Sequence, residues 1–587
     1  MTKAIGKWTL ALTGEALPGR ALVGGKAWSI ARMQYLGLPV PPAFTITTEA
    51  CHAYLQAGQL SNELLDELGK GLEWLAETSG RNFNADKSPL LVSVRSGAPI
   101  SMPGMMDTIL NLGITDATER ALAEETGNAE FARDTHRRFL ELFPAIAYKA
   151  TVPELDPHAT PSVWREEISS VIGKPLSIDP QFQLTEAVEA VFSSWNSRRA
   201  KRYRKHNGIP DDLGTAVTVQ AMVFGNLDDA SGTGVVFSRN PLTGESKPYG
   251  EYLHRAQGED VVSGKFTPQP LEAMRDSVPL AHEKLLSAIS ILEDENGDVQ
   301  DIEFTVQRGE LFLLQTRAAK RAPEAAVRFA IDMVNENRID IETSLARVSA
   351  EQVRSVLAPK LKQGSEHQEV IARGEPACQG IGIGVVVSSS DEAEKRAAAG
   401  ESVVLARPTT SPEDVHGMIA AKAVVTEQGG STSHAAVVSR ALGTPCVVGC
   451  GDGALANLAG QLVTVDGQNG KVLLGAAPIE FPLEAEQPEL AQLIQWLDER
   501  ITLEVELLAT AQLDNAFDLS SVEGGEDANL LSSLIVGKKT VMGGAIESDA
   551  GVAAALDAGV TTIIATNRLP VMLAAWHHMQ SAKQSGE

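Results

Sequence analysis

A single histidine stands in a setting suited to nucleophilic chemistry. His434 lies in TEQGGSTSHAAVVSRALGTPCVVG, residues 426–449, after two glycines and before a run of small residues. The pattern predicts a helix that begins near His434, is capped by a hydroxyl side chain among residues 431–433, and ends at Gly443. The positive end of the helix dipole would keep the imidazole neutral and favour a phosphoryl group on it. On spacing alone, a capped structural helix with an incidental histidine fits better.

A second group of candidate residues lies in DIEFTVQRGELFLLQTR, residues 301–317. Alternation around an Arg-Gly turn predicts a β-hairpin, with Asp301 and Glu303 on one face of the first strand. Gln315 and Arg317 share a face of the second strand, so pairing would gather all four side chains. Such oxygen ligands suit Mg²⁺ on nucleotide phosphates, and an arginine stabilises transferring charge. The alternative is an exposed charged face of a hairpin.

Three glycine-containing stretches are further candidates for phosphate binding. VGGKAWS has Lys26 directly after two glycines, where a cation could meet a phosphate close to the backbone. SVRSGAPISMPGMMDTILNLG offers Arg95 and then a Gly/Pro/Met loop around residues 104–107, and DASGTGVVFSRNP is a glycine hairpin. Taken alone, each of them is better explained as an ordinary turn. No Walker A pattern occurs, so the sequence does not support a P-loop site.

The composition bounds the class of protein. The chain has 587 residues, enough for three or four domains, and a formal net charge of -26. Because nucleic-acid and anionic-membrane binders need a basic surface, this charge argues against both. Four sparse cysteines indicate a reducing compartment, and we find neither a signal peptide nor an apolar run that could span a membrane. We therefore expect a cytoplasmic protein. The basic run RRAKRYRKH, residues 198–206, predicts a solvated helix face; the less favoured alternative is contact with a phosphate or an acidic partner.

The pattern of strand-forming, helix-forming and turn residues divides the chain into five segments of an α/β multidomain protein. Residues 1–211 alternate strand-like and helical patterns, and residues 212–321 are rich in strands and turns. A helical linker is expected over residues 322–365. A second compact unit follows over residues 366–475, and residues 476–587 comprise an acidic linker and a short βαβα pattern.

Six long blocks resemble the pyruvate phosphate dikinase family, in that family's order and over most of residues 20–475. They are GGKAWSIARMQYLGLPVPPAFTITTEAC, SVRSGAPISMPGMMDTILNLG, VTVQAMVFGNLDDASGTGVVFSRNPLTGE, YGEYLHRAQGEDVVSG, DIEFTVQRGELFLLQTR and TSPEDVHGMIAAKAVVTEQGGSTSHAAVVSRALGTPCVVG. The resemblance implies an ATP-grasp nucleotide-binding domain in two parts, residues 1–211 and 212–321. It also implies a swivelling phosphohistidine domain over residues 366–475.

The resemblance also implies roles for individual residues. In the family, ATP phosphorylates a histidine, AMP leaves, and the swivelling domain carries the phosphoryl group to a distant acceptor. The phosphorylated histidine corresponds to His434, with Arg95 and Arg317 as further catalytic residues. Glu303 and Gln315 would hold Mg²⁺. The residues implied for ATP binding are Lys26, Arg95, Asp301, Glu303, Gln315 and Arg317.

The C-terminal segment departs from the family pattern. A complete member continues into a TIM barrel of about 250 residues, which binds pyruvate and phosphoenolpyruvate. Here 112 residues follow Gly475, so we expect no complete TIM barrel. GGAIESDAGVAAALDAGVTTIIATN resembles a strand–helix–strand of the family near the entry to that domain, with Arg568 near the position of a phosphate-contacting arginine.

Three functions are compatible with these features. The first is a split phosphotransferase similar to phenylphosphate synthase, which passes the phosphoryl group to a phenolic acceptor bound with a partner subunit. The alternative is a split pyruvate phosphate dikinase or phosphoenolpyruvate synthase component that acts on pyruvate. The third is a non-catalytic regulatory homologue, which is disfavoured because every position needed for ATP and for the nucleophile is present.

Overall fold

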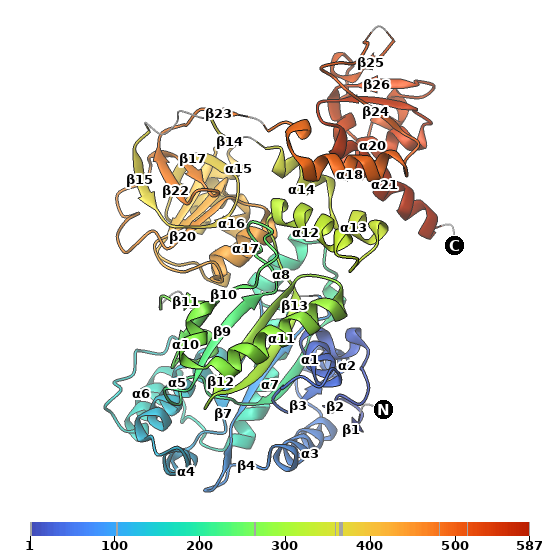
Figure 1. Cartoon of the computed structure of the whole chain (residues 1–587). Coiled ribbons are helices and arrows are strands. Elements are labelled where there is room, and N and C mark those ends of the chain that lie inside the picture. The colour runs from blue at the N-terminus through green and yellow to red at the C-terminus, as the bar shows by residue number, and fades with distance from the viewer. Residues whose placement is uncertain are drawn as a thin grey trace.

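The chain is a mixed α/β protein built from several units (Figure 1). The computed structural model describes residues 3–100, 102, 104–262, 266–358, 360–362, 368–480, 482–513 and 515–585. The N-terminal half forms the large lower unit of Figure 1. A sheet-rich unit and a C-terminal unit lie above it, with helices between them.

The first sheet of the large unit has six strands in the order β1-β2-β3-β8-β6-β7. Their bounds are β1 (Lys3–Ala4), β2 (Thr9–Leu12), β3 (Ala43–Ile46), β8 (Ala216–Ala221), β6 (Val92–Gly97) and β7 (Thr108–Leu112). We expected the first part of this unit to end at residue 211. Because β8 pairs with both β3 and β6, the first sheet is completed only at Ala221.

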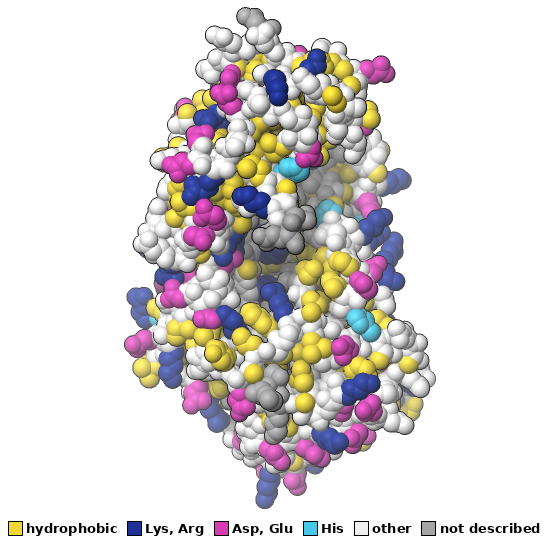
Figure 2. Space-filling view, turned by 90° about the vertical axis from the view of Figure 1, so that its right-hand side faces the viewer, with side chains coloured by type: hydrophobic (Ala, Val, Ile, Leu, Met, Phe, Trp, Pro, Cys, Tyr) yellow, Lys and Arg dark blue, Asp and Glu magenta, His cyan; other side chains and the backbone are white. Residues whose placement is uncertain are grey.

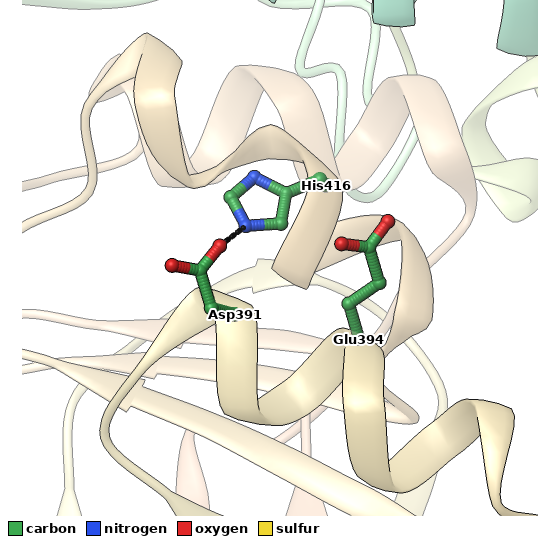
Figure 3. Close-up of side chains that lie close together, drawn as sticks. All are labelled: Asp391, Glu394 and His416. Atoms are coloured by element: carbon green, nitrogen blue, oxygen red, sulfur yellow. Dashed lines mark hydrogen bonds and ion pairs between the residues drawn. The ribbon is translucent and has the colours of Figure 1, made fainter.

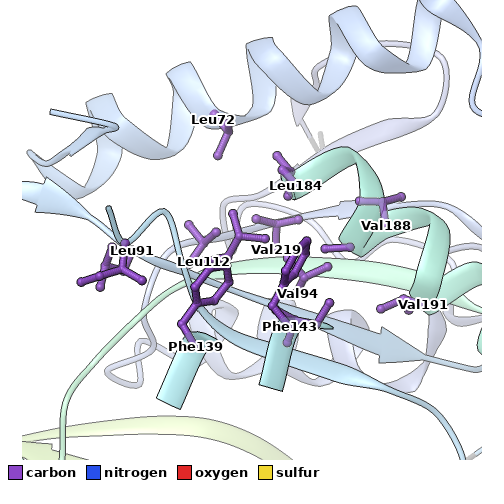
Figure 4. Packing of buried hydrophobic residues seen from close by; sticks show 14 of the residues in the cluster. Leu72, Leu91, Val94, Leu112, Phe139, Phe143, Leu184, Val188, Val191 and Val219 are labelled. Atoms are coloured by element: carbon purple, nitrogen blue, oxygen red, sulfur yellow. The ribbon is translucent and has the colours of Figure 1, made fainter. Parts of the chain in front are cut away.

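Helices cover this sheet and bury its core (Figure 4). They include α3 (Asn62–Ser79), α5 (Ala129–Ala147) and α7 (Pro180–Ser194). Phe139 and Phe143 of α5 and Leu184 of α7 are fully buried with Val94 and Val219 of the sheet. Burial of each such side chain stabilises the unit by about 2 kcal/mol.

The second sheet has five strands in the order β11-β10-β9-β12-β13. Their bounds are β11 (Gln269–Pro270), β10 (Tyr249–His254), β9 (Gly232–Phe237), β12 (Gln300–Gln307) and β13 (Glu310–Ala318). Helices α1 (Arg20–Tyr35) and α11 (Pro279–Asn296) pack on β12 and β13. The predicted hairpin is confirmed: β12 and β13 pair antiparallel, and both turn residues, Arg308 and Gly309, have positive φ.

Three helices lead from the large unit to the next one: α12 (Pro323–Asn335), α13 (Ile341–Arg347) and α14 (Ala350–Val356). A two-stranded ribbon of β14 (Lys360–Leu361) and β23 (Ile479–Glu480) joins both ends of the sheet-rich unit to the rest of the chain. That unit has an eight-stranded sheet, in the order β15-β22-β21-β17-β18-β19-β20-β16.

The eight-stranded sheet and its helices lie between residues 370 and 474. The strands are β15 (Val370–Arg373), β16 (Glu375–Cys378), β17 (Ile381–Val387), β18 (Val403–Arg407), β19 (Ala423–Thr426), β20 (Cys446–Val448), β21 (Leu462–Asp466) and β22 (Lys471–Leu474). The helices are α15 (Ser390–Ala398), α16 (Val415–Ala420) and α17 (His434–Leu442).

The C-terminal unit packs on the connecting helices. Its parallel strands lie in the order β24 (Glu504–Leu507), β27 (Thr562–Ala565), β26 (Thr540–Met542) and β25 (Phe517–Asp518). Helices α18 (Pro488–Asp498), α20 (Asp549–Asp557) and α21 (Arg568–Ser585) share one hydrophobic core with α12, α13 and α14. In the described part of the chain, no helix is long and apolar enough to cross a membrane.

Candidate functional site

The predicted charged hairpin gathers four of the candidate side chains. The register of β12 and β13 sets Asp301 opposite Arg317 and Glu303 opposite Gln315. Arg317 Nε donates to Asp301 Oδ2 at 2.7 Å. From β6 of the first sheet, Arg95 Nη2 donates to Glu303 Oε2 at 2.9 Å. The two sheets therefore meet at a cluster of arginines and carboxylates.

Lys26 joins this cluster from α1, where the helix is kinked. Gly24 has a φ of 74°, and a Cβ there would lie 1.7 Å from the carbonyl oxygen of Gly97. Only glycine permits this approach of α1 to β6. Burial, followed by the nearby charge of Arg95, lowers the pKa of Lys26 well below its usual range, although Glu303 opposes the shift.

The cluster has an excess of positive charge. Burial alone would raise the pKa of Glu303, but Arg95, Arg317 and Lys26 together hold it below its usual value. Three cations thus face Glu303 and Asp301 in a partly buried site. A polyphosphate would neutralise the excess, so these residues fit a nucleotide's phosphates. Glu303 and Gln315 add two side-chain oxygens on one face of the hairpin, which fits Mg²⁺.

A largely apolar cavity of about 240 Å³ adjoins the charged cluster. Arg95 and Glu303 line it together with Met222, Val223 and Leu314. The glycine stretch that the sequence offered as a phosphate site contributes β9, the central strand of the second sheet, and three of its residues line this cavity. An apolar pocket beside a cationic cluster fits a nucleoside attached to phosphates.

His434 is the first residue of α17, as predicted, and the helix ends at Gly443 with φ of 69°. Its Nδ1 lies 3.2 Å from Thr410 Oγ1. Its Nε2 is buried and has no hydrogen-bond partner in the described part of the chain. Burial lowers the pKa of His434 to about 4; Asp414 opposes the shift and Arg199 reinforces it. When Nδ1 donates to Thr410, Nε2 keeps its lone pair and is a nucleophile.

The imidazole of His434 faces the large unit. A Cβ at Gly104, in the loop after β6, would lie 3.2 Å from His434 Cδ2 and 3.4 Å from Nε2. The Gly/Pro/Met loop that the sequence offered as a phosphate site therefore contacts the candidate nucleophile. Its residues 101 and 103 lie outside the described residues.

Two of the three hydroxyl side chains before His434 bind the large unit, and the third, that of Ser433, does not cap α17. Ser433 is the N-cap residue but makes no side-chain capping bond. Ser431 donates from its backbone nitrogen and from its hydroxyl to Glu251 of β10, both at 3.1 Å, and Thr432 also donates to Glu251. The predicted side-chain cap is therefore wrong: the N-cap hydroxyl of Ser433 accepts no bond from the helix, and the hydroxyls of Ser431 and Thr432 point to a buried carboxylate of the large unit.

Helix α8 (Arg198–His206) also joins the two units. Arg199 donates to the backbone oxygen of Met105 at 3.1 Å and to Glu413 of the sheet-rich unit at 3.0 Å. One turn further, Tyr203 is buried and interacts electrostatically with Arg317. The expected solvated face is thus wrong for Arg199 and for the fully buried Arg204.

Sequence reasoning missed Glu251 and Arg199 as site residues. Glu251 lies in a strand within one of the blocks that carry the family resemblance, where an acidic residue among apolar neighbours was the available signal. Arg568, offered as a phosphate contact, is engaged elsewhere: its guanidinium donates to the backbone oxygen of Val505 and to Asp498, both at 2.9 Å.

One cluster resembles a metal site but lies on the surface of the sheet-rich unit (Figure 3). Asp391 and Glu394 of α15 point toward His416 of α16, and His416 Nε2 lies 2.8 Å from Asp391 Oδ1. Asp391 is 87% exposed, and Glu394 also pairs with Arg202 of α8 at 3.8 Å. These pairs explain why the three side chains lie together without a metal: one pair lies within the sheet-rich unit, and the other joins that unit to α8.

An apolar cavity beside clustered cations, together with a second unit whose buried histidine faces the unit that holds them, is the arrangement of a nucleotide-binding unit and a histidine domain. Residues 20–76 and 66–288 match the family model described as pyruvate phosphate dikinase, AMP/ATP-binding domain. Residues 399–470 match the model of the mobile domain of PEP-utilising enzymes. These matches identify the large unit and the sheet-rich unit as those two domains.

Three relatives with clear similarity are pyruvate, phosphate dikinases. The chain is 40% identical over 536 residues to the pyruvate, phosphate dikinase of Clostridium symbiosum, covering 85% of this chain and 61% of that protein. It is 43% identical over 523 residues to pyruvate, phosphate dikinase 2 of Zea mays, covering 83% and 59%. For the Rhizobium meliloti enzyme the identity is 42% over 530 residues, covering 82% and 58%.

The chain spans about 60% of the length of these curated relatives. Its homologues are phosphotransferases of the dikinase type, with a phosphohistidine intermediate. Together with the two domain matches, the similarity supports membership of the pyruvate phosphate dikinase family.

Proposed function

We propose that this chain acts as the ATP-dependent phosphotransferase component of a dikinase, in which His434 takes a phosphoryl group from ATP and passes it to pyruvate. The observation that carries the proposal is the docked histidine. Its Nε2 is buried, unpartnered among the described residues and directed at the unit that holds the cationic cluster. Its lowered pKa keeps the ring neutral at pH 7.

The residues have separate roles in the proposed transfer. Lys26, Arg95 and Arg317 bind the phosphates of ATP and neutralise the charge that develops as phosphorus is transferred. Glu303 and Gln315 hold Mg²⁺, which when bound neutralises and orients the phosphates. A bond forms between His434 Nε2 and the β-phosphorus as the bond to the α-phosphate oxygen breaks. AMP leaves, and the γ-phosphoryl group passes to phosphate or water.

Pyruvate is the better supported acceptor. The relatives are named pyruvate, phosphate dikinases, and none of the names given above refers to a phenolic acceptor. The comparisons therefore favour the reading that the sequence left as its alternative. A non-catalytic homologue fits less well, since Lys26, Arg95, Glu303 and Arg317 are assembled in one site.

The acceptor site is proposed to lie on a second protein subunit. In the described C-terminal unit, Arg568 is engaged by Asp498 and Val505 and does not offer its guanidinium to a ligand. Proteins that co-purify with the chain should be tested, together with it, for ATP-dependent phosphorylation of pyruvate and of phenols. This experiment identifies both the partner and the acceptor. Full phosphorylation of an acceptor by the purified chain alone would remove the need for a partner.

Autophosphorylation is the direct test of the proposed function. Purified chain with Mg²⁺ and β-radiolabelled ATP should form an acid-labile, base-stable adduct. His434→Ala should abolish the label, because it removes the only nitrogen proposed to bond to phosphorus. Equal labelling of that variant would exclude His434 as the nucleophile.

Arg317→Ala tests the cationic cluster by the same assay. We expect at least a hundredfold slower labelling, since a charge-neutralising guanidinium is lost from the transfer site. Arg328→Ala is the matched control, because its side chain is 43% exposed and its pair with Asp332 is long at 3.7 Å. Wild-type labelling by Arg317→Ala would remove Arg317 from the mechanism.

A further inference from the structure

A second cavity, of about 310 Å³, lies where three parts of the chain meet. Its walls come from the nucleotide-binding unit just after β13, from helices α12, α13 and α14, and from α17 of the histidine domain. Figure 2 shows a face that is hollowed at its middle, with dark blue Lys and Arg side chains around the hollow. The charged and amide side chains that line the cavity are Asp298, Lys320, Arg321, Arg347, Gln352 and Arg440.

The charges in this cavity are not balanced. Its one carboxylate, Asp298, accepts from Arg321 Nη1 at 2.7 Å and from Nη2 at 3.0 Å. Arg347 reaches the same carboxylate only at 3.8 Å. Within the described ranges, no carboxylate lies within 4.0 Å of the ammonium of Lys320. Burial, with the charges of Arg317 and Arg321, lowers the pKa of Lys320, so its surroundings are cationic.

Arg440 supplies a buried donor at the same cavity. Its side chain is 4% exposed, and it donates to the backbone oxygens of Ala377 at 3.0 Å and Ser431 at 2.8 Å. Its Nε is buried and has no hydrogen-bond partner in the described part of the chain. The guanidinium charge of Arg440 and the ammonium of Lys320 line one cavity, so both would attract an anion there.

We propose that this cavity binds a small polyvalent oxyanion of the phosphate class, inorganic phosphate or pyrophosphate, through Lys320 and Arg440, with Arg347 and Arg321 adding charge. The site is separate from the cluster of Lys26, Arg95 and Arg317 assigned to ATP, and it uses residues to which the proposed function gives no role. Guanidinium and ammonium groups in a partly buried site are the usual ligands of such oxyanions.

The bound oxyanion bridges two units. Lys320 and Arg321 belong to the nucleotide-binding unit, whereas Arg440 belongs to the helix that begins at His434. A ligand held by both units binds the docked arrangement better than a separated one, and so shifts the population toward docking. Arg440 also donates to the backbone of Ser431, so the oxyanion contacts the segment that presents the histidine.

Equilibrium dialysis of the full chain with radiolabelled phosphate, and separately with pyrophosphate, tests the site. Saturation with Mg²⁺ and a non-hydrolysable ATP analogue occupies the cationic cluster, so that any remaining oxyanion binding is at other sites. We expect one equivalent per chain for the wild type and at least tenfold weaker binding for Lys320→Met. Lys284→Met on exposed α11 is the matched control and should bind as the wild type does.

Each outcome bears on the proposal. Tighter binding of one ion than the other identifies the ligand, whereas no binding of either at millimolar concentration overturns the site. Wild-type binding by Lys320→Met also overturns it. Arg347→Met is a second variant, expected to weaken binding, and unchanged melting temperature and analogue binding establish that each variant folds. His434→Ala should bind the oxyanion normally, so failure of labelling and failure of this site are distinguishable.

Binding should also change the contact between units. With phosphate or pyrophosphate present, amide hydrogen exchange in α17 and α8 should slow in the wild type and not in Lys320→Met. Oxyanion binding without slower exchange would overturn the bridging role.

Discussion

His434 is prepared for nucleophilic attack mainly by burial. The sequence alone suggested the dipole of α17 as the cause of a neutral ring. In the structure the largest effect is loss of solvent, with Arg199 as a further cation and Asp414 opposing both. Thr410 occupies Nδ1, which leaves Nε2 as the reactive nitrogen. The tautomer and the charge state of the ring therefore depend on residues of two units.

The pH dependence of labelling follows from this environment. The docked ring has a pKa of about 4, against an ordinary value of about 6.5 when exposed. Protons therefore favour the undocked state, and the docked arrangement is fully stable above about pH 6.5 and weakens as the pH falls toward 4. We expect single-turnover labelling rates to stay level from pH 8 to about 6. A half-maximal rate near pH 6.5 would contradict the buried environment; circular dichroism at each pH controls for unfolding.

At the scale of elements, periodicity predicted those structures that depend on strands and turns adjacent in the sequence. The β12–β13 hairpin and its four-residue patch followed from alternation and an Arg-Gly turn, because a tight turn fixes the register. The position of β8 in the first sheet could not be predicted, since it depends on pairing with β3 and β6 more than a hundred residues earlier. Likewise, nothing local indicates that Ser431 and Thr432 bind Glu251 in preference to capping α17.

The kink of α1 gives a prediction at this scale. Gly24→Ala forces a Cβ to within 1.7 Å of the carbonyl oxygen of Gly97 and also strains a backbone with positive φ. Gly58→Ala is the matched control, because its φ is nearly the same, 75°, and nothing lies within 4 Å of its Cβ. We expect Gly58→Ala to cost about 1 kcal/mol of stability and Gly24→Ala several times more, with loss of labelling as Lys26 moves. Differential scanning calorimetry and the labelling assay measure both; equal costs would mean that the approach to β6 is not constrained.

At the scale of the molecule, the connections between units allow the histidine domain to dock on the nucleotide-binding unit as one body. Its two ends leave through the β14–β23 ribbon, and the C-terminal unit shares a core with α12, α13 and α14. The contacts of the histidine domain with the nucleotide-binding unit are of two kinds. A mixed apolar cluster includes Met105 and Tyr203 on one side and Ala435 and Val438 on the other. Polar contacts centre on Glu251, whose pKa burial raises.

Glu251 is the polar contact on which docking should depend most. Its buried carboxylate accepts three hydrogen bonds from Ser431 and Thr432. In the chain, only Ser433 separates these two residues from His434. Glu251→Ala leaves these donors without partners, and each unsatisfied buried group costs about 1–3 kcal/mol. The labelling rate at saturating ATP should therefore fall by about ten- to a hundredfold. ATP affinity should not change, because Glu251 does not line the nucleotide cavity.

Glu413→Ala is the matched control for this prediction, since it removes a carboxylate from the same contact between units. Glu413 is 71% exposed, and its ion pair with Arg199 is worth little in solvent, so labelling should slow by less than about threefold. Equal rates for Glu251→Ala and the wild type would mean that the apolar cluster alone positions His434. A lower ATP affinity in Glu251→Ala would instead show that β10 supports the nucleotide site. Only a slower transfer at unchanged affinity agrees with Glu251 as the residue that holds the histidine segment in place.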